Sequence, residues 1–397
     1  PYIEEAIVSA ILKIIPDLTT LAANDTAVIK GIIDAHVREV DDGLQKNMLA
    51  ALARIGDRAS AKHVVELAQD VDPDTHTEKW DALRETLCAI GDRQTIIGLL
   101  DAEEEKLKIL GAEVISRIGG EEDARPIIDR IHAVEGYVKR AYVEAIALIG
   151  APAGLEIFRL LTHDRDGHVA SRAIRAIGVV GSPDDIDELK PFFAHPYADV
   201  REAALDAIAR LGSAKAQGAF LTLLHNGEPQ MRIMGLTGLA RLNAPMLAKS
   251  IMRMLGDTAT DVRLAAVQIA KDAGLPLPTQ TIRTLLQDEN NDIRFVAIDL
   301  IGQHRLGELR TVLNDTIGSG DMWASYHAIE SLGQFRDDEA RTRLLSILAG
   351  GEDFLRIAAI KSLGEFEDEA LADELEIHID DTNLDVARAV SQAIDKL

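Results

Sequence analysis

Apolar residues recur along most of the chain with the spacing of an α-helix. In the stretch 199–212, which reads DVREAALDAIARLG, the residues Val200, Leu205 and Ile208 fall on one face of a helix and polar residues on the other. The aspartate that opens this stretch is a typical N-cap residue, and Gly212 stands where a glycine commonly follows the last helical turn. The stretch therefore predicts one amphipathic helix with a defined beginning and end.

The same pattern returns every 31 residues, and this period sets the architecture. The apolar residue and arginine at 200–201 recur at 231–232, 262–263, 293–294 and 355–356. Each copy is preceded by another helical stretch and a turn, so each unit is a helix pair. Units of this length stack on one another, because none can bury its apolar face alone. We therefore predict an all-α fold, an α-solenoid of about twelve helix pairs.

The solenoid is predicted to span residues 1–397 as a single domain. Residues 1–119 contain irregular units, beginning with a helix over residues 2–15, and residues 120–397 contain regular 31-residue units. The regular unit ends are expected at Gly150, Gly181, Gly212, Asn243, Gly274, Arg305, Arg336 and Glu367.

The repeated unit reads Asp, an aliphatic residue, Arg, any residue and Ala-Ala, and it ends on an aliphatic or aromatic residue and Gly. It resembles the HEAT repeats, particularly the short class named after phycobilisome lyases. The resemblance covers nearly the whole chain. It implies a right-handed superhelix in which the second helix of each pair lines the concave side. It does not imply one function, because such repeats occur in scaffolds, adaptors, chromophore lyases, a hydroxylase and DNA repair proteins.

The formal net charge of −24 weighs against nucleic-acid binding, which needs a cationic surface to replace the counterions of the phosphates. The acidic excess is steepest in residues 337–397, with 16 acidic and 6 basic side chains. This region is either a solvated acidic surface or a face for a basic segment of a partner. No apolar run reaches the roughly 20 residues of a membrane span, and the start lacks the basic region of a signal peptide. We therefore expect a cytoplasmic protein without membrane contact.

The arginine that follows the apolar residue lies near the edge of the core. HEAT-like families use a ladder of aspartates and arginines to hold their stack, and the resemblance implies the same role here. The aspartates at the helix starts are the expected partners, in the same unit or a neighbouring one, with anion binding by the arginine row as the alternative. The predicted ladder comprises Asp199, Arg201, Arg232, Asp261, Arg263, Asp292, Arg294 and Arg356.

Position two of the second helices, counted from the apolar residue before the arginine, points away from the core on a helical wheel. This position is apolar in five consecutive units, and such a row indicates a binding groove for a peptide or helix, unless packing against the next unit buries it. Trp323 adds a typical interface anchor, and Arg241 belongs to the polar rim. The position-two residues are Ile233, Leu264, Phe295, Tyr326 and Ile357.

The loop 70–81 carries carboxylates at the spacing of a helix-loop-helix calcium site. Thr75 replaces the glycine that such a loop needs at its sixth position, and the next helix is expected to begin at Thr77, inside the loop. The favoured interpretation is an acidic loop with Thr77 as N-cap and Glu78 in the first turn. The candidate calcium ligands are Asp70, Asp72, Asp74, Glu78 and Asp81.

The sequence contains no recognised catalytic or nucleotide-binding motif. None of its 11 histidines is followed by Glu, which excludes the His-Glu iron ligands of HEAT-type hydroxylases. We therefore predict no catalytic residue and no cofactor. The favoured function is a non-catalytic scaffold or adaptor that binds a protein segment along the concave face. The alternative, implied by the resemblance, is an accessory protein or lyase-like factor for the attachment of a tetrapyrrole chromophore.

Overall fold

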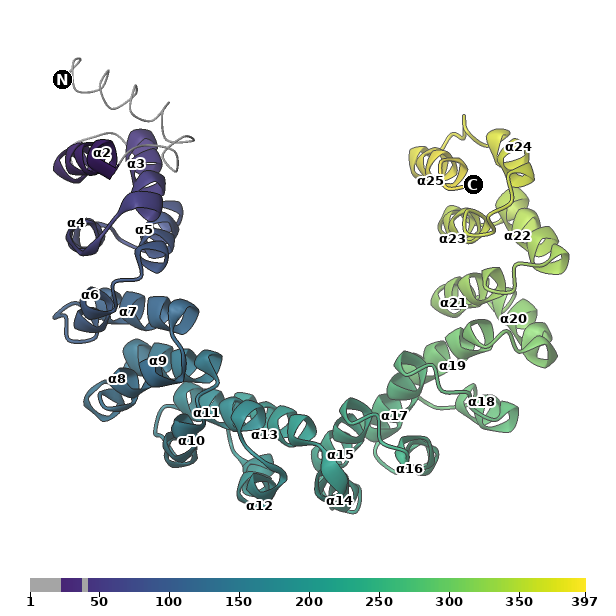
Figure 1. Ribbon diagram of the computed structural model, residues 1–397. Helices are drawn as coiled ribbons and strands as arrows, with labels where there is room; N and C mark the ends of the chain where they lie inside the picture. The colour runs from purple at the N-terminus through teal and green to yellow at the C-terminus, as the bar shows by residue number, and fades with distance from the viewer. Residues whose placement is uncertain (1–22, 38–41) are drawn as a thin grey trace. The chain divides into compact units, whose positions relative to one another are not determined.

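The computed structural model describes residues 23–37 and 42–397, and this part of the chain contains helices and no strands (Figure 1). The helix predicted over residues 2–15 lies outside the described residues. Contacts divide the chain into two compact units, Pro1–Ala216 and Gln217–Leu397. The boundary falls within α14 (Ser213–Leu223). Each unit is described by itself below.

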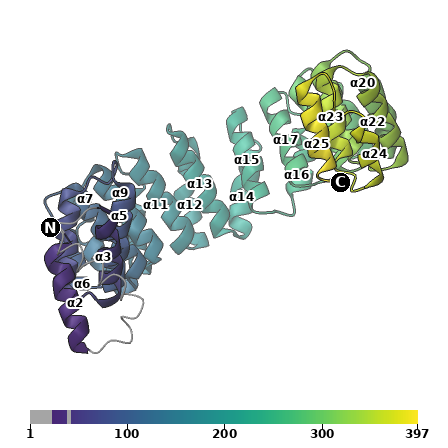
Figure 2. The same cartoon turned by 90° about the horizontal axis from the view of Figure 1, so that it is seen from above.

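Each unit has two layers of helices. The odd-numbered helices, which are the second helices of their pairs, pack on one another in chain order, so that neighbours lie side by side (Figure 1, Figure 2). Apart from α14, each even-numbered helix packs on the second helix that follows it. The apolar stripe of a second helix is therefore covered from both sides, which explains a core of Ala, Leu, Ile and Val.

The first unit contains six complete helix pairs in its described residues. Its second helices are α3 (Asp42–Ile55), α5 (Thr77–Ile90), α7 (Glu105–Ile118), α9 (Gly136–Ile149), α11 (Gly167–Val180) and α13 (Ala198–Leu211). The first helices are α2 (Ala23–His36), α4 (Arg58–Asp70), α6 (Arg93–Leu99), α8 (Arg125–Ile128), α10 (Leu155–Leu161) and α12 (Ile186–Leu189). Short 3₁₀ segments precede α8, α10 and α12.

The second unit continues the same alternation. Its second helices are α15 (Pro229–Arg241), α17 (Thr260–Asp272), α19 (Asn291–Gln303), α21 (Met322–Gly333), α23 (Asp353–Leu363) and α25 (Leu384–Ile394). The first helices are α16 (Leu247–Met254), α18 (Thr279–Leu285), α20 (Arg310–Ile317), α22 (Asp338–Gly350) and α24 (Ala370–Glu376).

The starts of the second helices confirm the predicted period. From α7 to α25, each second helix begins 31 residues after the previous one. The spacing is 35 residues between the starts of α3 and α5 and 28 residues between those of α5 and α7. The irregular spacing is thus confined to the N-terminal part of the described chain.

The predicted unit ends coincide with a left-handed backbone conformation, except Gly181, which is extended. Glycine occupies this conformation without strain at Gly150, with φ of 70°. At the equivalent positions of later helix-pair repeats, Arg305 and Glu367 adopt φ of 47° and 55°. A side chain in this region costs about 1–2 kcal/mol, so these units carry local backbone strain.

Gly302 lies inside α19 and has a packing role. A Cβ on Gly302 would lie 2.5 Å from the Cα of Ser331 on α21, closer than two carbon atoms can approach. Gly333 on α21 similarly allows close contact with Ser362 on α23, 2.7 Å from a built Cβ. These glycines let neighbouring second helices approach each other.

The opening aspartate of the repeated unit is not the N-cap that the sequence predicts. Tyr197 is the N-cap of α13, and Asp199 lies inside the first turn, where its charge is favourable for the helix dipole. The capping bonds instead come from the residue two positions before the N-cap or from the N-cap itself. In α19, for example, the Asn290 side chain accepts a hydrogen bond from the N–H of Ile293.

Candidate protein-binding surface

The ladder arginines bind aspartates, but not the aspartates that the sequence analysis assigned to them. The Nε and Nη2 of Arg232 donate to both carboxylate oxygens of Asp257, at 2.8 and 2.7 Å. Arg263 binds Asp288 in the same bidentate way, at 2.8 and 3.0 Å. In each pair the acceptor lies 25 residues after the arginine, in the turn that precedes the next second helix. The ladder therefore joins successive repeats.

The acceptor aspartates also order their own turns. One oxygen of Asp288 accepts the backbone N–H of Asn290 at 3.0 Å while both oxygens bind Arg263. The side chains of Arg263 and Asp288 are only 13% and 11% exposed. The hydrogen bond from Arg263 holds the pKa of Asp288 below its usual value, against the opposing effect of burial. Arg356 and Asp381 form a further rung of this kind.

The predicted acceptors Asp199, Asp261 and Asp292 are exposed residues in the first turns of their helices. A carboxylate oxygen of Asp199 lies 3.7 Å from the Nδ1 of His168. Within the described residues, neither Asp261 nor Asp292 forms an ion pair with an arginine. Each of these aspartates precedes its arginine by two residues, and side chains at that spacing lie on opposite sides of a helix, so they cannot pair. Arg201 has Asn226 in place of an aspartate 25 residues later, and it donates to the backbone carbonyls of His195 and Pro196.

The five apolar residues at position two are all half-buried. Phe295 on α19 stacks on His327 of α21, with ring centroids 4.9 Å apart. Tyr326 on α21 stacks on Phe354 of α23, at 5.3 Å. Packing against the next helix pair therefore covers part of each ring and leaves part of it accessible. Ile233, Leu264 and Ile357 have the same intermediate burial on α15, α17 and α23.

An aromatic cluster stands out on the second helices of the second unit. We use this name for Phe295, Trp323, Tyr326, His327 and Phe354. The Trp323 ring lies 6.1 Å from that of Tyr326 and 5.4 Å from that of Phe354, both in edge contacts. Trp323 remains 59% exposed and Phe354 37% exposed. The rings therefore hold one another in place while presenting apolar surface to solvent.

Carboxylates surround the aromatic cluster. Asp299 lies 2.8 Å from the Nδ1 of His327 and 2.5 Å from the Nζ of Lys271. A hydrogen bond between the side chains of Tyr326 and Glu330, together with burial, raises the pKa of Tyr326 to about 12. The tyrosine is therefore a neutral hydrogen-bond donor at neutral pH.

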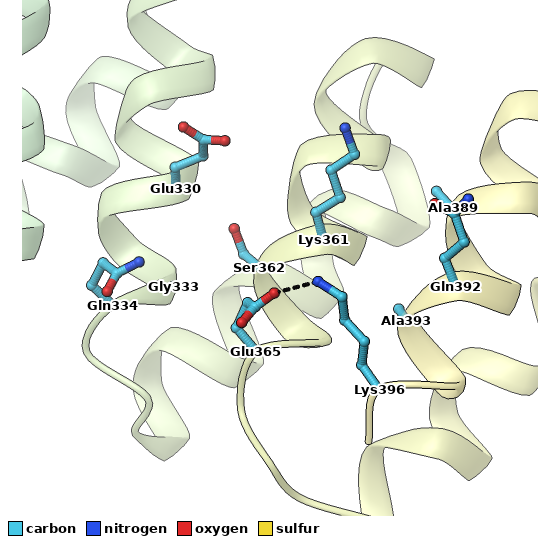
Figure 3. Close-up of a pocket in the computed structure, with 10 residues that line it drawn as sticks. All are labelled: Glu330, Gly333, Gln334, Lys361, Ser362, Glu365, Ala389, Gln392, Ala393 and Lys396. Carbon is cyan, nitrogen blue, oxygen red and sulfur yellow. Dashed lines mark hydrogen bonds and ion pairs between the residues drawn. The ribbon is translucent and has the colours of Figure 1, made fainter. Parts of the chain in front are cut away.

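Glu330 connects the cluster to a pocket between α21, α23 and α25 (Figure 3). The pocket has a volume of about 400 Å³ and small residues, such as Gly333 and Ser362, among its lining. Lys361 is exposed here and forms no ion pair with any described residue. Glu365 and Lys396 pair with each other at 2.6 Å. A polar pocket thus continues the apolar surface of the cluster.

Phe354 and the pocket were not predicted from the sequence. Phe354 occupies the position immediately before the repeat's apolar residue, and so does Trp323. The preceding units have Asp261 and Asp292 at this position, so the change from acidic to aromatic residues is a signal in the sequence itself. Arg241, predicted as part of the rim, is exposed at the end of α15.

The candidate calcium ligands do not form a cation site. In the described residues, no group of three or more His, Cys, Asp or Glu side chains is placed to hold a metal ion. Asp70 ends α4, and Asp72 accepts the backbone N–H of Asp74. Glu78 lies in the first turn of α5, as predicted, and Asp81 pairs with Arg84. The N-cap of α5 is His76, one residue before the predicted Thr77. The early helix start separates the carboxylates.

No helix among the described residues combines the length and the apolar character that crossing a membrane requires.

The family model for HEAT repeats matches residues 124–209 and 312–395. No curated protein matches the chain in sequence. Among solved structures, the chain is similar to the karyopherin Kap121p bound to Pho4p, with 9% identity over 98% of this chain and 51% of that chain, and a TM-score of 0.61. It is also similar to Kap121p bound to the SUMO protease Ulp1p, with 10% identity, coverage of 95% and 49%, and a TM-score of 0.59.

The chain spans about half the length of the karyopherin it matches, and the likeness is one of fold. The matches do not distinguish the phycobilisome-lyase class, which stays a prediction. The helix-pair architecture and the similarity to the karyopherin show an α-solenoid fold, and the family model identifies HEAT repeats in the two matched stretches.

Proposed function

We propose that this chain is a non-catalytic interaction protein that binds a segment of a partner protein along the second helices of residues 217–397. The exposed aromatic cluster carries the proposal. Trp323 and Phe354 present large apolar surfaces whose rings are already ordered by contact with Tyr326. Preordered aromatic side chains are typical anchors of protein interfaces, because little side-chain entropy is lost on binding.

The surrounding charge favours a partner segment that combines basic and apolar residues. Glu330 borders the cluster, and exposed Glu352 and Asp353 immediately precede Phe354. Lysine and arginine side chains bind both to carboxylates and to the faces of aromatic rings. The pocket beside the cluster offers small residues that allow close approach of an extended backbone. Kap121p, which shares the fold, has been solved with protein partners such as Pho4p and Ulp1p.

Selection of displayed random peptides tests this proposal. Peptides selected on the wild-type protein are expected to be basic and apolar, and to lose at least roughly tenfold in affinity, about 1.4 kcal/mol, on the variant Trp323→Ser/Phe354→Ser. Tyr137→Ser is the matched control, because Tyr137 is an exposed aromatic at the same repeat position in the first unit. Equal binding to the double variant, with its fold intact by circular dichroism, would contradict the proposal. Titration with a linear tetrapyrrole tests the lyase-like alternative, which requires a change in visible absorbance.

A further inference from the structure

The ladder is interrupted after Arg294. The residue 25 positions further along is Ser319, where the rungs from Arg232 and Arg263 have an aspartate. Ser319 occupies the equivalent place in its turn, two residues before the N-cap Asp321 of α21. Its hydroxyl accepts a hydrogen bond from the backbone N–H of Asp321 at 3.3 Å. Asp257 and Asp288 accept the equivalent N–H groups in their own turns. The turn therefore keeps the same form, but Ser319 has no carboxylate that could bind Arg294.

Arg294 keeps half of the interactions made by Arg263. The Nη1 of Arg263 donates to the carbonyls of Asp257 and Thr258, and the Nη1 of Arg294 donates to those of Asp288 and Glu289, at 2.8 and 3.2 Å. The guanidinium is thus held in the same place.

The other edge of the guanidinium differs. In Arg263, Nε and Nη2 bind the carboxylate of Asp288. In Arg294, Nη2 donates to the side chain of Asn291. Its Nε donates to no protein acceptor, and the guanidinium has no carboxylate within ion-pair distance, among the residues that the structure describes. The edge that binds a carboxylate in the neighbouring repeat therefore retains free donor capacity.

Arg294 lines a pocket of about 510 Å³ between α18, α19, α20 and α21. This volume lies within the range of about 300–1,000 Å³ that is common for small-molecule sites. Arg283 lines the same pocket and makes one weak hydrogen bond, to the carbonyl of Glu308 at 3.4 Å. Gln287 and Ser319 add polar groups to the lining. Two arginines and the polar residues Gln287, Thr316 and Ser319 therefore line one cavity.

We propose that this pocket binds a small carboxylate ligand, with Arg294 holding one carboxylate as Arg263 holds that of Asp288. The second guanidinium, Arg283, suits a second carboxylate, so a dicarboxylate is the preferred class. Asp321 also lines the pocket, with one oxygen bonded to the N–H of Ala324. Its negative charge and the net charge of the chain oppose the binding of any anion, so only an anion that both guanidinium groups engage is expected to bind. The site shares no residue with the aromatic cluster and does not depend on the proposed function.

Nuclear magnetic resonance of the arginine side chains tests the site directly. Titration of the full chain with succinate, at constant ionic strength, is expected to shift the Arg294 Nε–H resonance with a midpoint on the order of 1–10 mM. The resonance is assigned by its loss in Arg294→Lys. Acetate should bind more weakly, because it engages one guanidinium. An acidic dipeptide tests whether the natural carboxylate belongs to a protein or to a free metabolite. If the dipeptide shifts the Arg294 resonance more strongly than succinate does, the carboxylate belongs to a protein.

Ser319→Asp supplies the absent carboxylate from within the chain. It is expected to raise the melting temperature and to abolish the succinate-induced shift. Ser346→Asp is the control, since it adds the same charge at an exposed position of α22 and should leave the shift intact. The proposal is overturned if succinate causes no shift beyond that of sodium chloride, if inorganic phosphate binds better than succinate, or if the shift persists in Ser319→Asp.

Discussion

Replacing Asp288 by Asn removes the ionised acceptor of one ladder rung with little change in shape. The asparagine oxygen can still accept the N–H of Asn290, so the turn is preserved. Arg263 loses its bidentate carboxylate and keeps one ion-pair partner among the described residues, the exposed carboxylate of Glu289 at 3.3 Å. Breaking a fully buried ion pair costs about 3–5 kcal/mol, and an exposed pair contributes about 0–1 kcal/mol. With side chains 13% and 11% exposed, we expect a loss of about 2 kcal/mol.

Urea unfolding measures this loss, followed by far-ultraviolet circular dichroism and by the fluorescence of Trp323, the tryptophan of the second unit. Asp261→Asn is the matched control, because it removes the same charge from an exposed residue in the first turn of α17. Its expected cost is below about 1 kcal/mol, from the helix dipole alone. If Asp261→Asn destabilises the protein as much as Asp288→Asn, the assignment of the ladder partners is wrong.

Three further predictions follow from the same packing. The pKa of Asp288 is lowered in the folded state, so the ionised carboxylate stabilises the fold above its unfolded pKa near 4, and this stabilisation is lost as pH falls through the folded pKa. The stability difference between wild type and Asp288→Asn should therefore disappear in acid, as measured by urea unfolding from pH 7 to 3. Arg305→Gly should relieve the strain of a positive φ and raise stability by about 0.5–1 kcal/mol, whereas Gly274→Ala, at the equivalent position, should lower it by about 1 kcal/mol; thermal melts with no such opposite signs would refute this. Gly302→Ala should cost about 1–3 kcal/mol in urea, because its Cβ would collide with α21, while Gly307→Ala, which meets no neighbouring atom, should be nearly neutral; equal effects would contradict the packing role.

The helix pairs could be predicted from the sequence because one pattern recurs many times. A single helix end is ambiguous, but Gly212 and the residues at 31-residue intervals from it define the ends jointly. The packing role of Gly302 could not be predicted in this way, because only the position of the neighbouring helix α21 shows that a side chain there would collide.

The ladder partners were harder to predict, because an aspartate close in the sequence can compete with a distant one, as at Arg263. Asp261 lies two residues before Arg263 in the sequence, whereas Asp288 is 25 residues away. Helix geometry excludes the nearer one, since residues two apart face opposite sides. A comparison of repeats contains the correct signal: Asp257, Asp288 and Asp381 each have an arginine 25 residues earlier.

The exposed aromatic surface was predicted in part. Position two identified Phe295 and Tyr326, but their burial depends on how closely neighbouring helices approach, which the sequence of one repeat does not contain. Phe354 became evident only when the ring contacts with Trp323 and Tyr326 were known.

Site-specific photo-crosslinking in the producing organism tests the central claim most directly. A benzophenone amino acid at position 323 should form a covalent adduct with a discrete protein partner, and the crosslinked partner peptide should be basic and apolar. The same amino acid at position 137, an equally exposed aromatic position of the first unit, should form no such adduct. Adducts at position 137 with none at position 323 would contradict the assignment of the aromatic cluster as the binding surface.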